Sequence, residues 1–240
     1  MSQSGELCLP HKAQAGREKK ELSSCLLYTE HHLPEVTASL VLQSAVTAAS
    51  SQSRVTVVVG GSKWSEMPQL WHLMPQLSPA VMKSISFLYP RDSKVRGPLT
   101  SSQHSHVSHF KDLTKHFIEL SSKDKNNLPN TIIVSDLDTL VEKSSGREDR
   151  DFLLGFIRLS AILVDFSHYF AKQNQTPSTL LVLSKLPSAK AKVLSNRQQE
   201  FYSEFWRVES NKISCQSSKN KMIVNFSKKD NEYFLDNLQY

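Results

Sequence analysis

The sequence predicts an α/β fold with a mainly parallel central sheet and antiparallel strands at its C-terminal end. Between Ser24 and Ser184, short aliphatic and β-branched runs alternate with segments of helical spacing, which is the pattern of parallel strands joined by helices. Further strand-like runs follow with only one short helix among them. The chain has 240 residues, of which 39% are hydrophobic, so it is long enough to bury a core.

Eight runs are expected to be strands because they are short, rich in aliphatic, aromatic or β-branched residues, and bounded by turn residues. The first five are expected to form the parallel centre: Ser24–Tyr28, Arg54–Val59, Ser84–Tyr89, Thr131–Asp136 and Thr179–Ser184. The last three are expected to pair antiparallel: Glu204–Glu209, Lys221–Phe226 and Glu232–Leu235.

Five segments are predicted to be helices. Apolar residues recur every three or four positions in Val36–Ser50 and His106–Leu120. Asp151–Lys172 is apolar almost all round, so we expect other elements to cover most of it. The two short helices are Pro79–Lys83 and Asn196–Tyr202. Residues 1–23 lack apolar periodicity and are predicted to be disordered, which leaves residues 24–240 as one domain.

The run Thr131–Asp136 is a buried type of strand that ends in an acid. In P-loop NTPases, such a strand carries the Walker B aspartate to the magnesium ion of a bound nucleotide. That role requires a loop that holds the phosphates, and no segment of this chain reads G-x-x-x-x-G-K-[ST]. Many α/β strands end in Asp for capping alone, and Asp138 could cap the next turn in the same way.

The segment between the first strand and the first helix lies where a P-loop would lie. Aligned on G-x-x-x-x-G-K-[ST], Glu30 and Glu35 replace the two glycines, Val36 replaces the lysine, and Thr37 matches the threonine. Two carboxylates would repel the phosphates, and the lysine charge is missing. The sequence therefore predicts a degenerate P-loop in which Thr37 and Asp136 are the remnants of an ATP/Mg site. The alternative is an ordinary strand–helix loop.

Two other patterns are weaker. Gly60–Lys63 follows a strand and contains Gly, Ser and Lys, but the spacing from Gly to Lys is too short for a phosphate loop. His104, His106 and His109 lie in a polar region without cysteines, which favours a solvated loop, so no metal site is predicted. Three scattered cysteines without CxxC indicate reduced thiols.

The C-terminal third is basic. From Lys185 to Lys229 there are ten Lys and Arg against three Glu, a net charge of +7. This favours a polyanion as partner, although a solvated lysine-rich surface explains it equally well. The candidate DNA-binding residues are Lys185, Lys190, Lys192, Arg197, Lys219, Lys221, Lys228 and Lys229. Phe201, Tyr202, Phe205 and Trp206 lie among them and could stack on bases, or else belong to the core.

The start of the chain is polar, without an apolar secretory segment, and no apolar run reaches the length of a membrane span. We therefore expect a soluble protein with no membrane partner.

Several runs, with their order and spacing, resemble the SWIM zinc-finger-associated ATPase-like proteins of the Shu complex, distant relatives of the RecA-type recombinase paralogues. The similarity extends loosely from Ser24 to Leu235. The matching runs are Thr37–Leu40, Met67-Pro68, Ser84–Pro90, Thr131–Asp136 and Phe166–His168.

The resemblance implies a RecA-like P-loop NTPase fold, nuclear location, single-stranded DNA binding and DNA-stimulated ATP hydrolysis with ATP and Mg as cofactors. It also implies a SWIM zinc-finger partner and support of recombinase and its paralogues in homologous recombination and double-strand-break repair. Asp136 matches the Walker B acid and Thr37 the Walker A threonine. The Walker A glycines and lysine do not match. The family's water-activating glutamate is replaced by Gly60-Gly61-Ser62, and its glutamine by Ser184-Lys185. Weak or absent hydrolysis is expected. An active ATPase with an atypical phosphate loop and a pure protein-interaction module are the alternatives.

Overall fold

The structure, a computed structural model, describes residues 22–60, 64, 67–72, 74–75, 77–89, 105–106, 110–123, 128–142, 149–187, 189–190, 193–194, 201–215, 222–230 and 232–239. The helices are α1 (Pro34–Ser50), α2 (Pro79–Lys83), α3 (Phe110–Lys123), α4 (Leu137–Glu142) and α5 (Asp149–Asn174). The strands are β1 (Leu22–Thr29), β2 (Val55–Val59), β3 (Leu70–Trp71), β4 (Ile85–Tyr89), β5 (Ser105–His106), β6 (Thr131–Ser135), β7 (Ser178–Lys185), β8 (Glu204–Val208), β9 (Lys212–Cys215), β10 (Ile223–Lys229) and β11 (Glu232–Gln239).

These strands form one sheet in the order β3-β11-β10-β9-β8-β1-β7-β6-β2-β4-β5. The pairs from β8 through β1, β7, β6, β2 and β4 to β5 are parallel, whereas β8, β9, β10 and β11 pair antiparallel. The predicted fold class is thereby confirmed. β6 lies between β7 and β2 with all five residues buried, as expected for a parallel strand that is covered on both faces.

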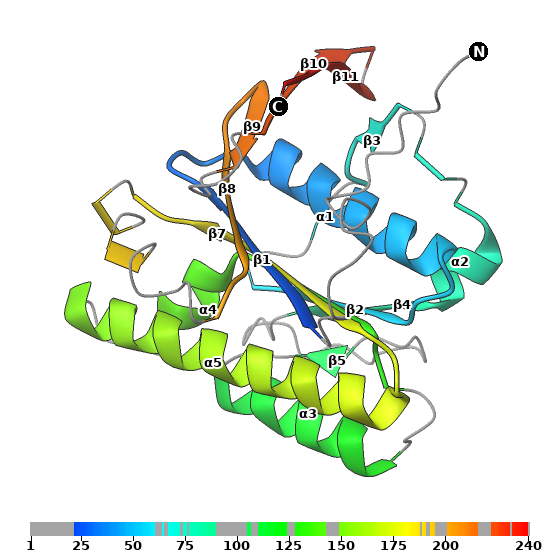
Figure 1. Cartoon of the computed structure of the whole chain (residues 1–240), viewed down its shortest axis with the longest axis vertical. Coiled ribbons are helices and arrows are strands. Elements are labelled where there is room, and N and C mark those ends of the chain that lie inside the picture. Colours follow the sequence, from blue (N-terminus) through cyan, green and yellow to red (C-terminus); the bar gives the residue numbers. More distant parts are fainter. Residues whose placement is uncertain are drawn as a thin grey trace, which may run out of the picture.

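Helices cover both faces of the parallel part (Figure 1), with α1 on one face and α3, α4 and α5 on the other. Successive strand residues point to opposite faces, so neighbouring residues of β6 enter different cores. Ile132 and Val134 pack in the core that contains Phe156 of α5, while Ile133 packs in the core that contains Leu40 of α1.

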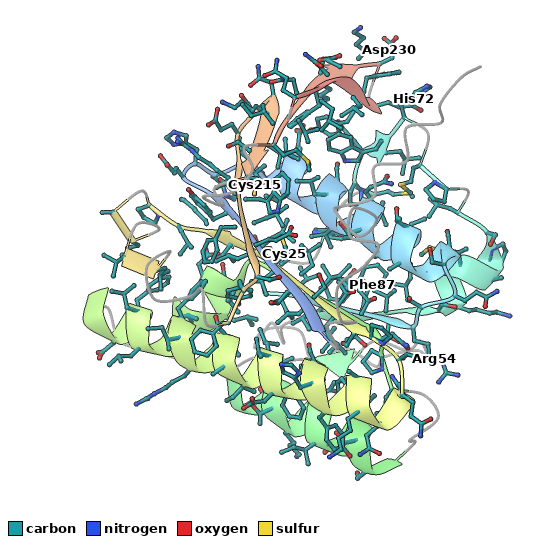
Figure 2. The ribbon with its side chains drawn as sticks, viewed as in Figure 1. Cys25, Arg54, His72, Phe87, Cys215 and Asp230 are labelled. Atoms are coloured by element: carbon teal, nitrogen blue, oxygen red, sulfur yellow. The ribbon has the colours of Figure 1, made fainter. Side chains whose placement is uncertain are left out.

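The antiparallel end of the sheet covers α1 from outside. Phe226 of β10 and Tyr233 of β11 belong to the same core as α1, together with Trp71 of β3. The rings of Phe226 and Tyr233 lie 5.2 Å from that of Trp71. In Figure 1, β10 and β11 lie beyond α1, and Figure 2 places the labelled His72 and Asp230 in the same region. Helix α1 therefore packs against the parallel strands and also against aromatic residues of the C-terminal strands and β3.

Several elements differ from the expectation. β3, β5, β9 and α4 are additional, and β11 extends to Gln239 rather than Leu235. They are short or polar, so their apolar pattern is weak. Leu22 and Ser23 belong to β1, although they were expected to be disordered; the rest of that segment lies outside the described residues. The predicted helix Asn196–Tyr202 also falls mostly outside them, and its last residues, Phe201 and Tyr202, are not helical.

Helix α5 has the length and composition of a possible membrane span over Asp151–Asn174. Core helices of soluble proteins often satisfy the same criterion. In this fold, Phe156, Leu159, Leu163 and Phe170 are buried against the sheet and its neighbouring helices. The predicted covering of this helix is thus confirmed for one face, while Leu154 and Tyr169 remain exposed.

Neither Cys25 nor Cys215 forms a disulfide. Cys25 pairs with Glu204 of β8, and Cys215 pairs with Trp206 on the other side of the same strand (Figure 2). Because a strand separates them, the two side chains cannot form a disulfide without movement of the backbone.

Replacing Tyr202 by Phe is expected to lower the free energy of unfolding by about 1–2 kcal/mol. The Tyr202 hydroxyl donates a hydrogen bond to Ser160 Oγ over 2.9 Å, and both residues are buried. The variant leaves the serine hydroxyl without this partner. In urea unfolding, Tyr202→Phe combined with Ser160→Ala should cost less than the sum of the single changes, whereas simple additivity would contradict the coupling.

Candidate functional site at the carboxyl edge of the sheet

The carboxyl ends of the parallel strands meet at one edge of the sheet, where ligands of open α/β sheets usually bind. β1 ends at Thr29, β6 at Ser135 and β7 at Lys185. The loop from Glu30 to Leu33 follows β1 and leads into α1; together with the first turn of α1, up to Thr37, it forms the β1–α1 loop. This edge therefore contains the predicted remnants of the nucleotide site.

Thr37 does not extend from its helix toward a ligand. α1 begins at Pro34, two residues earlier than expected from the apolar pattern, because proline suits the first position of a helix. The Thr37 hydroxyl lies 2.9 Å from the carbonyl oxygen of Leu33 and 3.1 Å from that of Pro34. Its proton is therefore used by the backbone of the first helical turn.

The two carboxylates in the position of the P-loop glycines are both paired within the chain. Glu30 Oε1 lies 3.2 Å from Nη2 of Arg207 on β8. The same guanidinium approaches Glu209, with 3.3 Å between Nε and Oε1. Glu35 Oε2 lies 2.9 Å from Nζ of Lys228 on β10, and this hydrogen bond raises the pKa of Lys228. The negative charges of the loop are thus neutralised by the C-terminal strands.

Asp136 is positioned differently from a residue that continues a strand. β6 ends at Ser135, and Asp136 follows with φ = 55°, in the left-handed region that L-residues rarely occupy. Its Oδ2 accepts a hydrogen bond of 2.7 Å from Ser135 Oγ. The last position within the strand is therefore a buried serine, and the acid lies in the turn after it.

Asp138 connects the ends of two central strands. Its Oδ1 accepts hydrogen bonds of 2.9 Å from Ser184 Oγ and from the backbone N–H of Lys185, while Ser184 Oγ also lies 3.1 Å from the Asp138 N–H. Burial raises the pKa of Asp138, and the nearby charge of Asp136 acts in the same direction, while the two hydrogen bonds oppose the shift. Ser184 and Lys185, which stand where the resembled family has a glutamine, thus bind the carboxylate of Asp138.

Gly60 directly follows β2 and lies close to the backbone at the end of β6. A Cβ atom on this residue would lie 2.3 Å from the backbone oxygen of Asp136 and 2.8 Å from the side chain of Leu140. Its N–H donates a 2.8 Å hydrogen bond to the carbonyl of Ser135. No side chain fits at this position, so it cannot hold a glutamate. The rest of the Gly60–Lys63 pattern lies outside the described residues.

Four of the eight candidate DNA-binding residues are described. Lys185 is exposed at the end of β7, and Lys228 and Lys229 are exposed on β10. Lys190 Nζ lies 4.4 Å from the centre of the Phe152 ring. The other four, Lys192, Arg197, Lys219 and Lys221, lie outside the described residues.

Of the aromatic residues between these cations, Tyr202, Phe205 and Trp206 are buried, which confirms the core interpretation for them. Phe201 is half-buried and packs against the same core as Tyr202. The hypothesis that bases stack on Tyr202, Phe205 and Trp206 is therefore wrong.

The sequence indicates Asp138 only as a possible cap and gives Arg207 no role at the site, although each residue organises part of this edge. The sequence places Glu30 directly after one strand and Arg207 within another. Only the pairing of β1 with β8 brings them together. Among the described residues, no group of three or more His, Cys, Asp or Glu could hold a metal ion.

The residues at this edge do not fit Mg-ATP. Glu30 and Glu35 bring two negative charges to the place of the phosphates, and no lysine stands at position 36. The hydroxyl of Thr37 bonds to its own helix.

No protein-family model matches the chain, and no curated protein matches its sequence. Solved structures do match in fold. A KaiC-like protein from the hyperthermophilic archaeon Pyrococcus horikoshii aligns over 90% of this chain and 90% of its own, with 10% identity and a TM-score of 0.52. A second solved structure, an ATPase domain, aligns over 90% of this chain and 85% of its own, with 6% identity and a TM-score of 0.50. The chain has a RecA-like P-loop NTPase fold; at these identities the likeness concerns the fold alone.

Proposed function

We propose that this protein is a RecA-like subunit that supports homologous recombination as a scaffold, without turning over ATP. In this proposal it acts in the nucleus, within a Shu-type complex, beside a SWIM zinc-finger protein. It binds single-stranded DNA and helps to stabilise filaments of the recombinase and its paralogues during double-strand-break repair. The family resemblance of Thr131–Asp136 and the other matching runs supports the pathway, and the RecA-like fold is compatible with it.

The observation that carries the scaffold role is the internal pairing of the β1–α1 loop. Glu30 and Glu35 bind Arg207 and Lys228, so the place where RecA-like ATPases hold phosphate is used to connect the loop to the C-terminal strands. A triphosphate would have to displace these carboxylates and would be repelled by them, because like charges at short range raise each other's energy. The site therefore favours a structural use of the fold.

Single-stranded DNA binding is assigned to the cations of the C-terminal third. If about five phosphates are contacted, log K should fall against log salt with a slope of about −3.5. Fluorescence anisotropy with a labelled oligo-dT strand measures this slope. Lys185→Gln with Lys229→Gln should make it less steep by about 1.4, because two phosphate contacts are lost.

The matched control neutralises two exposed lysines on the helices that cover the face of the sheet opposite α1. They are Lys115 of α3 and Lys172 of α5. This double variant carries the same net charge and should bind as the wild type does. Binding that does not respond to salt, or equal losses in both double variants, would contradict DNA binding by these cations and favour the pure interaction module.

The active ATPase is tested with the purified protein and single-stranded DNA. We expect no ATP turnover above background and no rise in Tm with Mg-ATP. Asp136→Asn is the appropriate variant, because asparagine tolerates the left-handed backbone at this position. Turnover by the wild type that this variant abolishes would overturn the scaffold proposal.

A further inference from the structure

Carboxylates of the β1–α1 loop are interleaved with cations along the carboxyl edge of the sheet. The strand register places Lys185 beside Thr29 on one side of β1 and Arg207 beside Tyr28 on the other. Glu30 comes directly after this end of β1. In space, the acidic β1–α1 loop therefore lies between cations of the basic C-terminal third.

The two ion pairs of this loop differ in how firmly they are held. Glu30 and Arg207 have side-chain exposures of 19% and 39%, and Glu209 binds the same guanidinium as a second partner. Glu35 and Lys228 are 65% and 41% exposed. Exposed ion pairs contribute little to stability, so the Glu35–Lys228 pair is the one that another anion can open.

A phosphodiester can take the place of Glu35, because it is also an anion that accepts hydrogen bonds from an ammonium group. The displaced carboxylate would remain in the first turn of α1, where the partial positive charge of the helix N-terminus stabilises a negative side chain. Opening the pair therefore does not leave Glu35 without electrostatic support.

We propose that Glu35 is an internal competitor for Lys228, which single-stranded nucleic acid must displace in order to bind this lysine. The loop in the position of the phosphate cradle thus supplies an anion of its own and limits the affinity of the cationic strands for polyanions. This inference rests on the proposed DNA binding and adds an autoinhibitory contact to that surface.

The test is a double-mutant cycle on the full chain, measured as anisotropy of labelled oligo-dT at low salt. Glu35→Gln should bind about threefold more tightly than the wild type, as expected for the release of an exposed ion pair. Lys228→Gln should bind more weakly. Adding Glu35→Gln to Lys228→Gln should give no further gain, because the released partner is missing. The gain should shrink as salt screens the charges.

Glu119→Gln is the matched control, because it removes the carboxylate of another surface ion pair, with Lys115, on α3. It should leave the affinity unchanged. A gain in Glu35→Gln that persists in the Lys228→Gln background, or that Glu119→Gln reproduces, would show a general charge effect and overturn the inference while DNA binding stands. If no variant binds the strand, both this inference and the proposed DNA binding are wrong.

Discussion

Replacing Gly60 by Ala is expected to destabilise the protein by about 3 kcal/mol, the upper part of the usual range for overpacking. The added Cβ would lie 2.3 Å from the Asp136 carbonyl oxygen and 2.9 Å from that of Ser135. Both atoms belong to the backbone at the end of β6, so no flexible side chain can move away. The strands would have to separate where Gly60 N–H bonds to Ser135.

Urea unfolding followed by circular dichroism measures this loss as a lower midpoint. Gly155→Ala is the control, since Gly155 lies within α5 at a half-buried position and alanine favours the helix by up to about 1 kcal/mol. Equal stability of Gly60→Ala and the wild type would show that β2 and β6 do not approach each other as closely as the structure has them.

Replacing Asp138 by Ala is expected to cost about 2–3 kcal/mol of folding stability, since it removes two hydrogen bonds and leaves the Lys185 N–H without its acceptor. Asp138→Asn should be at least as stable as the wild type at pH 7. Its amide oxygen can still accept from Ser184 and Lys185, and no charge is buried. If both variants lose the same stability, the hydrogen-bond explanation is wrong.

The pH dependence of the same residue has a defined sign. Burial raises the pKa of Asp138 in the folded protein above its value in the unfolded chain, which is about 3.9. The folded state therefore holds the proton up to a higher pH. The contribution of Asp138 to stability is lowest above the folded pKa and increases as the pH falls through it toward about 4.

The advantage of Asp138→Asn over the wild type should therefore shrink between pH 7 and about 4.5 in urea unfolding experiments. An advantage that grows over this interval would show that the folded-state pKa is lowered instead. Comparing the two proteins at each pH cancels the titration of the other acids.

The central strands could be predicted because their patterns are unambiguous. β2 and β6 are completely buried, and both read as continuous apolar or β-branched runs. The strand β9 could not be predicted, since its four residues include Lys, Ser and Cys and only two are buried. Helix α4 could not be predicted for a related reason, because its six residues are too few to show a helical period of apolar residues.

The candidate site was predictable in its composition and not in its contacts. Glu30, Glu35 and Thr37 could be placed by counting from the first strand, and their chemistry already argued against a phosphate cradle. The sequence did not reveal that Asp136 turns away from the strand with a positive φ. It also did not reveal that Asp138 would bind the end of β7.

The sequence alone determined three features, because each depends on residues that are close along the chain. They are the alternation of strands and helices, the acidic loop without its lysine, and the basic C-terminal third. The tertiary structure decided which cations neutralise that loop. Glu35 and Lys228 are 193 positions apart, and they meet because β8 pairs with β1 and the following hairpins cover α1. Hydrophobic spacing within a strand does not encode its neighbours in the sheet, so the ion pairs follow from the order of the strands.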